Sequence, residues 1–166
     1  MVFGLSLPAF TILHVVISLI GIAAGLIFFG ALATGRWNSF VNGTFLDFTL
    51  LTSVTGFMFP NVPIAPPFIF GVISIVLLAV SFFALYVGKL RGRWITAYLV
   101  TALIAQWLNM VVLIVQSFQK IPVFHALAPT GAEPPVLMGQ GLVLLIILFF
   151  AWKTIVRPRW SPAASA

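Results

Sequence analysis

The side chains that could carry chemistry in this sequence are few, and most of them lie within long apolar segments. Asp47 is the one acidic residue inside such a segment, and carboxylates within a membrane often belong to ion or proton pathways. Thr44 and Asp47 also have the spacing of a capping box, in which an acidic side chain stabilises the start of a helix. We expect this capping role for Asp47, with Arg36 close enough to serve as its counter-ion.

His14 and His125 are the two candidates for binding a cofactor. Imidazole nitrogens ligate haem iron and copper, and the thioethers of Met58 and Met138 are expected at the same end of the molecule. Two histidines with no fixed spacing do not define such a site, so we predict that His14 is a hydrogen-bonded structural residue. A haem or copper site that uses His14 or His125 is the alternative.

Three amide side chains recur on one side of a long apolar segment: Gln106, Asn109 and Gln116. Such a row lines a polar path, holds a quinone carbonyl, or bonds to neighbouring helices, and we favour the last because lipid offers no hydrogen-bond partners. The sequence contains no GxSxG, HExxH, Walker-type or paired-carboxylate motif and no cysteine. We therefore assign no catalytic residue and no metal cluster, and an enzyme is not indicated.

The composition indicates what surrounds these residues. Of the 166 residues, 62% are hydrophobic and only 6% are charged, whereas soluble domains carry about 25% charged residues. So few charged side chains cannot cover a water-facing globule of this size, so lipid must cover it. The net charge of +6 lies in short clusters between apolar segments. This distribution indicates membrane topology and contact with anionic headgroups, and no nucleic-acid partner.

We predict an all-α integral membrane protein that forms a single domain over residues 1–166. A bilayer core about 30 Å thick requires roughly 20 apolar residues in a helix. Segment 43–59 is short and contains Asp47, so the alternative is four spans with 43–59 re-entrant. MVFGLSLPAF has no basic residue and does not resemble a cleaved signal. The five predicted transmembrane helices span about 9–33, 43–59, 68–88, 95–118 and 137–156.

The basic residues predict the orientation. With five spans, every Lys and Arg except Lys120 falls on one side of the membrane. Basic residues concentrate on the cytoplasmic side, so we expect an outside N-terminus and a cytoplasmic C-terminus. With four spans, the distribution weakens to six basic residues against two, and both termini are inside. In the five-span topology, one side of the membrane has Arg36, Lys89, Arg91, Arg93, Lys153, Arg157 and Arg159, and the other side has Lys120.

Small residues at helical spacing predict where the helices pack, because glycine lets two backbones approach closely in lipid. The first predicted helix has such a stripe after His14, and the third has another. The last helix has none, so we expect it to have the most lipid contact. The predicted packing residues are Ser18, Gly21 and Gly25 on the first helix and Gly71, Ser74, Ser81 and Gly88 on the third.

Two segments, TSVTGFMFP and FQKIPVFHALAPTGAEPP, resemble a group of small multi-pass bacterial inner-membrane proteins with no established activity. The resemblance extends over most of the chain. It implies a location in the bacterial plasma membrane and implies no particular chemistry.

These observations favour an accessory or scaffold subunit, or a homo-oligomer, whose work is association within the membrane. The partners expected are the bilayer and either another membrane protein or a second copy. One alternative is a redox protein that holds haem, copper or quinone near the outer leaflet through His14. The other is a small transporter or channel that uses Asp47 with the face formed by Gln106 and Asn109.

Overall fold

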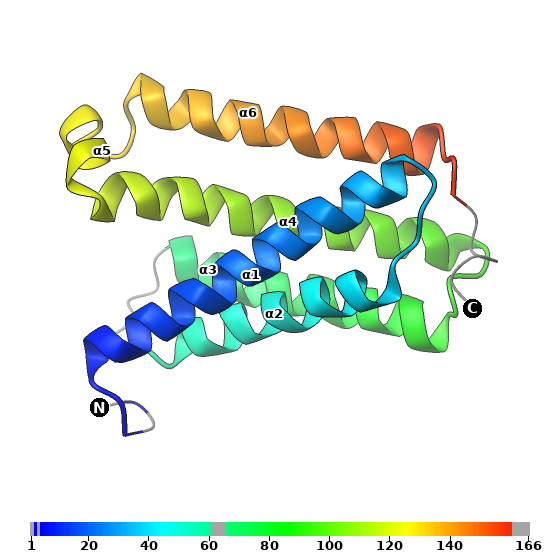
Figure 1. Ribbon diagram of the computed structural model, residues 1–166, viewed down its shortest axis with the longest axis horizontal. Helices are drawn as coiled ribbons and strands as arrows, with labels where there is room; N and C mark the ends of the chain where they lie inside the picture. The colour runs from blue at the N-terminus through cyan, green and yellow to red at the C-terminus, as the bar shows by residue number, and fades with distance from the viewer. Residues whose placement is uncertain (1, 3, 61–65, 161–166) are drawn as a thin grey trace.

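The computed structural model describes residues 2, 4–60 and 66–160 of the chain. These residues form helices and connections, and their only β-type pairing is an isolated bridge between Val2 and Leu5. Figure 1 shows the long helices side by side, with the chain running back and forth between the two ends of an elongated bundle. The helices are α1 (Leu7–Ala33), α2 (Ser39–Phe57), α3 (Pro66–Phe82) with its π-helical extension η1 (Phe83–Val87), α4 (Arg93–Lys120), the short α5 (Pro122–Leu127), and α6 (Pro134–Ala151) with its π-helical extension η2 (Trp152–Val156).

The prediction of an all-helical fold is confirmed, and four of the five predicted spans correspond to helices that could cross a membrane; α2 is not among them. Among the described residues, four helices are long and apolar enough to cross a membrane. Of these four, the last is the least buried within the bundle, as its lack of a small-residue stripe predicted. The four segments are Leu7–Ala33, Phe68–Val87, Arg93–Lys120 and Pro134–Val156.

The second predicted span corresponds to α2, which begins four residues earlier than expected. Asn38 is the N-cap residue of α2, and its Oδ1 accepts a hydrogen bond from the backbone N–H of Val41 at 3.0 Å. Asp47 is therefore well inside the helix, and the hydroxyl of Thr44 donates to the carbonyl of Phe40 at 3.0 Å. The predicted capping role of Asp47 is wrong, because an amide side chain upstream already caps the helix.

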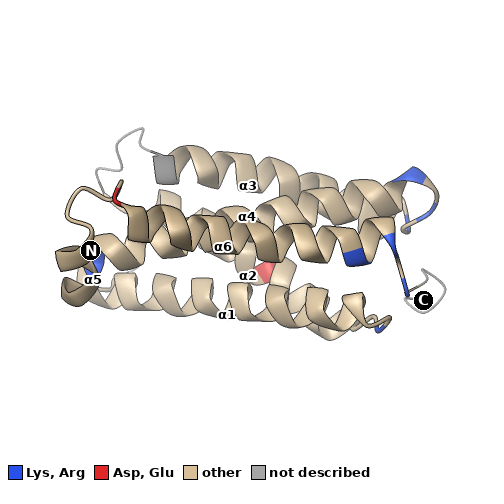
Figure 2. Cartoon of the chain, turned by 90° about the horizontal axis from the view of Figure 1, so that it is seen from above, with Lys and Arg blue, Asp and Glu red and all other residues tan. Residues whose placement is uncertain are grey.

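The helix α4 lies at the centre of the arrangement. It contacts α1, α2, α3 and α6, while α1 and α2 form a closely packed antiparallel pair along one side (Figure 1). In Figure 2 the Lys and Arg residues gather at the end of the bundle where the chain terminates. The exception is Lys120, which ends α4 next to α5 at the opposite end. The two ends of the bundle therefore differ strongly in positive charge.

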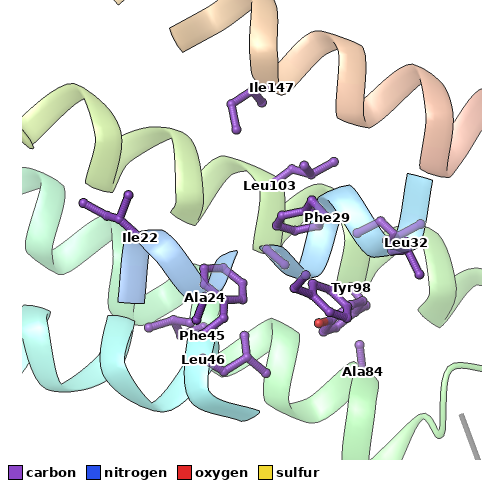
Figure 3. Packing of buried hydrophobic residues seen from close by; sticks show 14 of the residues in the cluster. Ile22, Ala24, Phe29, Leu32, Phe45, Leu46, Ala84, Tyr98, Leu103 and Ile147 are labelled. Carbon is purple, nitrogen blue, oxygen red and sulfur yellow. The ribbon is translucent and has the colours of Figure 1, made fainter. Parts of the chain in front are cut away.

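Large apolar side chains fill the space between α1, α2 and α4 (Figure 3). Phe29 and Phe45 are fully buried, and their rings meet edge to face with centroids 5.7 Å apart. At the basic end, Trp37 packs against Tyr98 and against Trp160, which folds back from the C-terminal segment. The indole N–H of Trp160 donates to the carbonyl of Thr154 at 3.2 Å. Aromatic side chains thus close this end of the core.

Close packing at Gly25 gives a test of this core. A methyl group at Gly25 would lie 2.6 Å from Cδ of Gln106 and 2.8 Å from the ring of Phe45, whereas one at Gly30 would meet nothing within 4 Å. We expect Gly25→Ala to lower the free energy of unfolding by about 1–3 kcal/mol, because overpacking displaces buried side chains. The matched variant Gly30→Ala should not lower it, since alanine has the higher helix propensity. Thermal unfolding in detergent measures both, and equal midpoints for the two variants would contradict this packing.

Candidate functional site

Polar side chains of α4 meet polar side chains of α2 inside the bundle. The amide Nδ2 of Asn109 donates to Oγ1 of Thr49 at 3.1 Å, and Thr49 is completely buried. Nearer the basic end, the hydroxyl of Tyr98 donates to Oδ1 of Asn42, and both residues are buried. Because these partners come from protein rather than lipid, they fix the inner face of α2 against α4.

Gln106 connects α4 to α1. Its side chain is completely buried, and Nε2 donates to the backbone carbonyl of Ile22 at 3.0 Å. The amide lies directly over Gly25, where a larger residue would collide with it. Its Oε1 atom has no hydrogen-bond partner within the described part of the chain. Gln116, further along α4, is half-buried.

The stripe of small residues on α3 and η1 faces α2 and α4. Gly71 lies against the ring of Phe57, with 2.9 Å between an added Cβ and that ring. Ser74 is buried, and Ser81 shares a hydrogen bond of 2.7 Å with Thr101 of α4. At the basic end, Gly88 lies directly beneath the indole ring of Trp94. Gly71, Ser81 and Gly88 therefore lie where side chains of α2 or α4 approach closely.

His14 faces α2 near the end of the bundle away from the basic cluster. Its Nδ1 and Oγ1 of Thr55 are 2.8 Å apart, and the ring of Phe59 meets the imidazole edge to face. The hydroxyl of Ser18 donates to the backbone carbonyl of His14 at 2.8 Å. His125, by contrast, is exposed on the short helix α5. Among the described residues, no group of three or more His, Cys, Asp or Glu side chains could hold a metal ion.

Asp47 lies on the opposite side of α2 from the inner hydrogen bonds. Two residues along a helix correspond to a rotation of about 200°, so Asp47 and Thr49 point in opposite directions. Asp47 is exposed, and no side chain of the described residues forms a hydrogen bond or an ion pair with it. The structure therefore does not bring Asp47 together with Gln106 and Asn109, which face the interior.

The exposed and half-buried residues around Asp47 form one face of the helix, which we call the outer strip of α2. Its apolar members are exposed: Phe40 is 83% exposed, Leu51 is 44% exposed and Val54 is 42% exposed. A side chain added at Gly43 would meet nothing within 4 Å. The outer strip consists of Phe40, Gly43, Thr44, Asp47, Leu51 and Val54.

The contacts of its neighbours give the depth of Asp47 in the bundle. Phe45 packs at Gly25 of α1, and Phe48 packs at Gly21. Gly21 lies near the middle of the 27 residues of α1, and Gly25 lies about one turn closer to its C-terminal end. The carboxylate is thus about halfway between the two ends, some 12 Å from the start of its own helix. The predicted capping role placed Asp47 at the start of the helix. Because Asn38 is the N-cap residue and α2 begins at Ser39, Asp47 instead lies in the middle of the helix.

A groove between α4 and α6 was not anticipated from the sequence. It has a volume of about 230 Å³, and its walls are entirely apolar. The indole N–H of Trp107 is buried behind this wall and has no hydrogen-bond partner among the described residues. It offers space to an apolar molecule and no polar group to orient one. The residues that line it are Val100, Leu103, Ile104, Trp107, Leu144, Ile147, Leu148, Ala151 and Ile155.

Glu133 organises the connection that leads into α6. Its carboxylate accepts hydrogen bonds from the backbone N–H of Thr130 at 2.8 Å, from the hydroxyl of Thr130 at 2.8 Å, and from the backbone N–H of Ala132 at 3.0 Å. These bonds favour the charged form and lower the pKa of Glu133 to about 2. Glu133 therefore stabilises the connection between α5 and α6 in which it lies.

Comparison of the chain with known protein families, with curated proteins and with solved structures found no match. Its function has to be argued from the arrangement of its own side chains.

The pKa of Glu133 gives a second prediction. Because this pKa is depressed from 4.5 to about 2, the hydrogen-bonded connection is fully stabilised above pH 4.5 and loses that stabilisation as the pH falls toward 2. We expect a carboxyl titration by ¹³C NMR in micelles to show a midpoint near 2 for Glu133, accompanied by shifts of the Thr130 and Ala132 amides. Thr130→Val should raise the midpoint by removing one hydrogen bond. A midpoint near 4.5 in the unmodified chain would show that the connection is open.

Proposed function

We propose that the chain is a five-span accessory subunit of the bacterial inner membrane that associates laterally with another membrane protein through the outer strip of α2. The observation that carries this proposal is the exposed carboxylate of Asp47 halfway along the bundle. Carboxylates at such a depth are rare, and they usually pair with another group.

The packing of α2 supports the view that it crosses the membrane. Its 19 residues extend about 28 Å, close to the thickness of the hydrocarbon core. Near the basic end Asn42 bonds to Tyr98 of α4, and near the other end Thr55 bonds to His14 of α1. These hydrogen bonds join α2 to two apolar helices near both of its ends, which supports the proposal that α2 crosses the membrane with them. The lower hydropathy of α2 follows from polar side chains on both of its faces, Asn42 and Thr49 toward α4 and Asp47 on the outer face.

The distribution of charge supports the orientation. Every basic residue except Lys120 lies in a connection or a terminal turn at one end of the bundle, and basic residues concentrate on the cytoplasmic side. This distribution supports an outside N-terminus and a cytoplasmic C-terminus. The resemblance of two segments to small bacterial inner-membrane proteins supports a location in the bacterial inner membrane.

The outer strip of α2 favours a protein that associates with a partner in the membrane over one that acts as a monomer. A charged side chain that faces hydrocarbon at the centre of a helix costs roughly 2.5–3.5 kcal/mol even on insertion scales. Among the described residues, no side chain forms a hydrogen bond with the Asp47 carboxylate that would offset this cost. The strip also combines a large exposed aromatic ring at Phe40 with an open approach at Gly43. A partner helix that packs here would cover the carboxylate.

Single cysteines test the five-span topology directly, because the chain contains none. With five spans, Ser39→Cys is on the cytoplasmic side and Pro60→Cys is on the outer side. We expect a membrane-impermeant maleimide added to intact cells to label Pro60→Cys and to label Ser39→Cys only after the cells are opened. If both cysteines react from outside, α2 does not span, and the five-span proposal fails.

Photo-cross-linking tests the association. A photoreactive residue at Val54, on the outer strip, should give a discrete adduct in native bacterial membranes, and Asp47→Leu should reduce its yield at least severalfold. The matched control is Leu145 on α6, which is 66% exposed and should give only lipid adducts. The proposal fails if Val54 and Leu145 give the same pattern, or if the adduct at Val54 does not depend on Asp47.

A further inference from the structure

We propose that the partner segment is a transmembrane helix of another protein that carries a Lys or Arg near its middle, paired with the carboxylate of Asp47. This inference rests on the proposed function and adds the chemistry of the partner. It follows from the charge, the depth and the surroundings of Asp47.

The chain itself cannot supply the cation. Each of its Lys and Arg residues lies in a connection or in a terminal turn of a helix, for example Arg93 at the start of α4 and Lys153 in η2. None lies at the depth of Asp47, which is set by the packing of Phe45 and Phe48 against the middle of α1. The other acidic residue, Glu133, is held in its own connection by three hydrogen bonds. Asp47 is therefore the one described carboxylate free to pair with a partner.

A second copy of the chain fits the site less well than a cationic helix does. Two copies that dock through the same strip by a two-fold axis bring two Asp47 side chains together, and like charges disfavour each other. A headgroup of a lipid is also unsuitable, because the carboxylate is about 12 Å from the helix start and faces acyl chains. A cation within a transmembrane helix lies at the required depth and has the required sign.

The outer strip is shaped to receive such a helix. Gly43 lies one turn from Asp47 on the same face, and its open surface lets a second backbone approach closely. The hydroxyl of Thr44 already donates to the carbonyl of Phe40, so its oxygen is left to accept a bond from an ammonium or guanidinium group. Leu51 and Val54 continue the contact on the other side of the carboxylate. The pair would thus be enclosed by apolar and small side chains.

Designed peptides test the sign of the partner. The probes are three Leu-rich transmembrane helices of one length, with Lys, Leu or Glu at the central position, each labelled with an acceptor dye. The chain is labelled with a donor at Ser39→Cys and reconstituted in phosphatidylcholine vesicles. We expect energy transfer to report at least tenfold tighter association of the Lys helix than of the Leu or Glu helix. Asp47→Asn, nearly isosteric and on an exposed face, should abolish this preference while leaving the thermal midpoint unchanged.

Two variants serve as controls. Glu133→Gln removes the other carboxylate and should keep the preference for the Lys helix, and Asp47→Glu should also keep it. Equal association of the Lys and Leu helices with the unmodified chain overturns the cationic partner. So does energy transfer between donor-labelled and acceptor-labelled copies of the chain that depends on Asp47, since it identifies a second copy as the occupant. If the Lys and Leu helices associate equally, an Asp47-dependent cross-link at Val54 to another membrane protein would leave the proposed association intact. A second copy as the occupant overturns both proposals, and so does the absence of an Asp47-dependent cross-link.

Discussion

Inside a bilayer, a polar side chain finds its hydrogen-bond partner in protein or not at all, and α4 is built around this constraint. Gln106 bonds to the backbone of α1, Asn109 bonds to α2, and Thr101 bonds to Ser81 of α3. Apolar burial contributes little to holding helices together in lipid, because acyl chains solvate leucine as well as another helix does. The hydrogen bonds of α4, with the glycines that let its neighbours approach, therefore determine which helices meet and in what register.

The attachment of α6 follows a different rule. It packs on α4 through apolar contacts, for example Gly139 against Ile114, and it is the least buried of the four apolar helices. The apolar groove between α4 and α6 lies along the same boundary. Such an interface depends on shape alone, whereas each contact of α4 with α1, α2 and α3 also has a fixed hydrogen-bond partner. Hydrogen bonds thus fix the packing of α1, α2 and α3 against α4, whereas α6 packs on α4 through apolar contacts.

The sequence predicted the helices well because hydropathy and length are local properties. Each predicted span lies within four residues of the observed helix ends, even where α2 falls short of the hydropathy of the others. The amides and small residues could be recognised as inward-facing, but their partners could not, because Gln106 and Ile22 are joined only by the fold. The return of Trp160 onto Trp37 was hidden for the same reason.

Asp47 illustrates a different limit of local reasoning. Thr44 and Asp47 have the spacing of a capping box, yet a single polar residue upstream, Asn38, starts the helix earlier and removes that role. Once α2 begins at Ser39, helical geometry alone turns Asp47 away from Thr49 and therefore away from α4. Asp47, for which the sequence predicted the wrong role, is thus an exposed carboxylate with no side-chain partner among the described residues.

The helix α2 consequently has two polar faces that are treated unequally. Its inner face places Asn42 and Thr49 against α4, where each has a partner, and its outer face places Asp47 where the described residues provide none. A helix between lipid and protein needs polar groups on one face only, since each additional one lowers the gain from insertion. Polarity on both faces is the pattern of a helix enclosed by protein on both sides. This chain encloses the inner side, and the proposed partner helix would enclose the outer side.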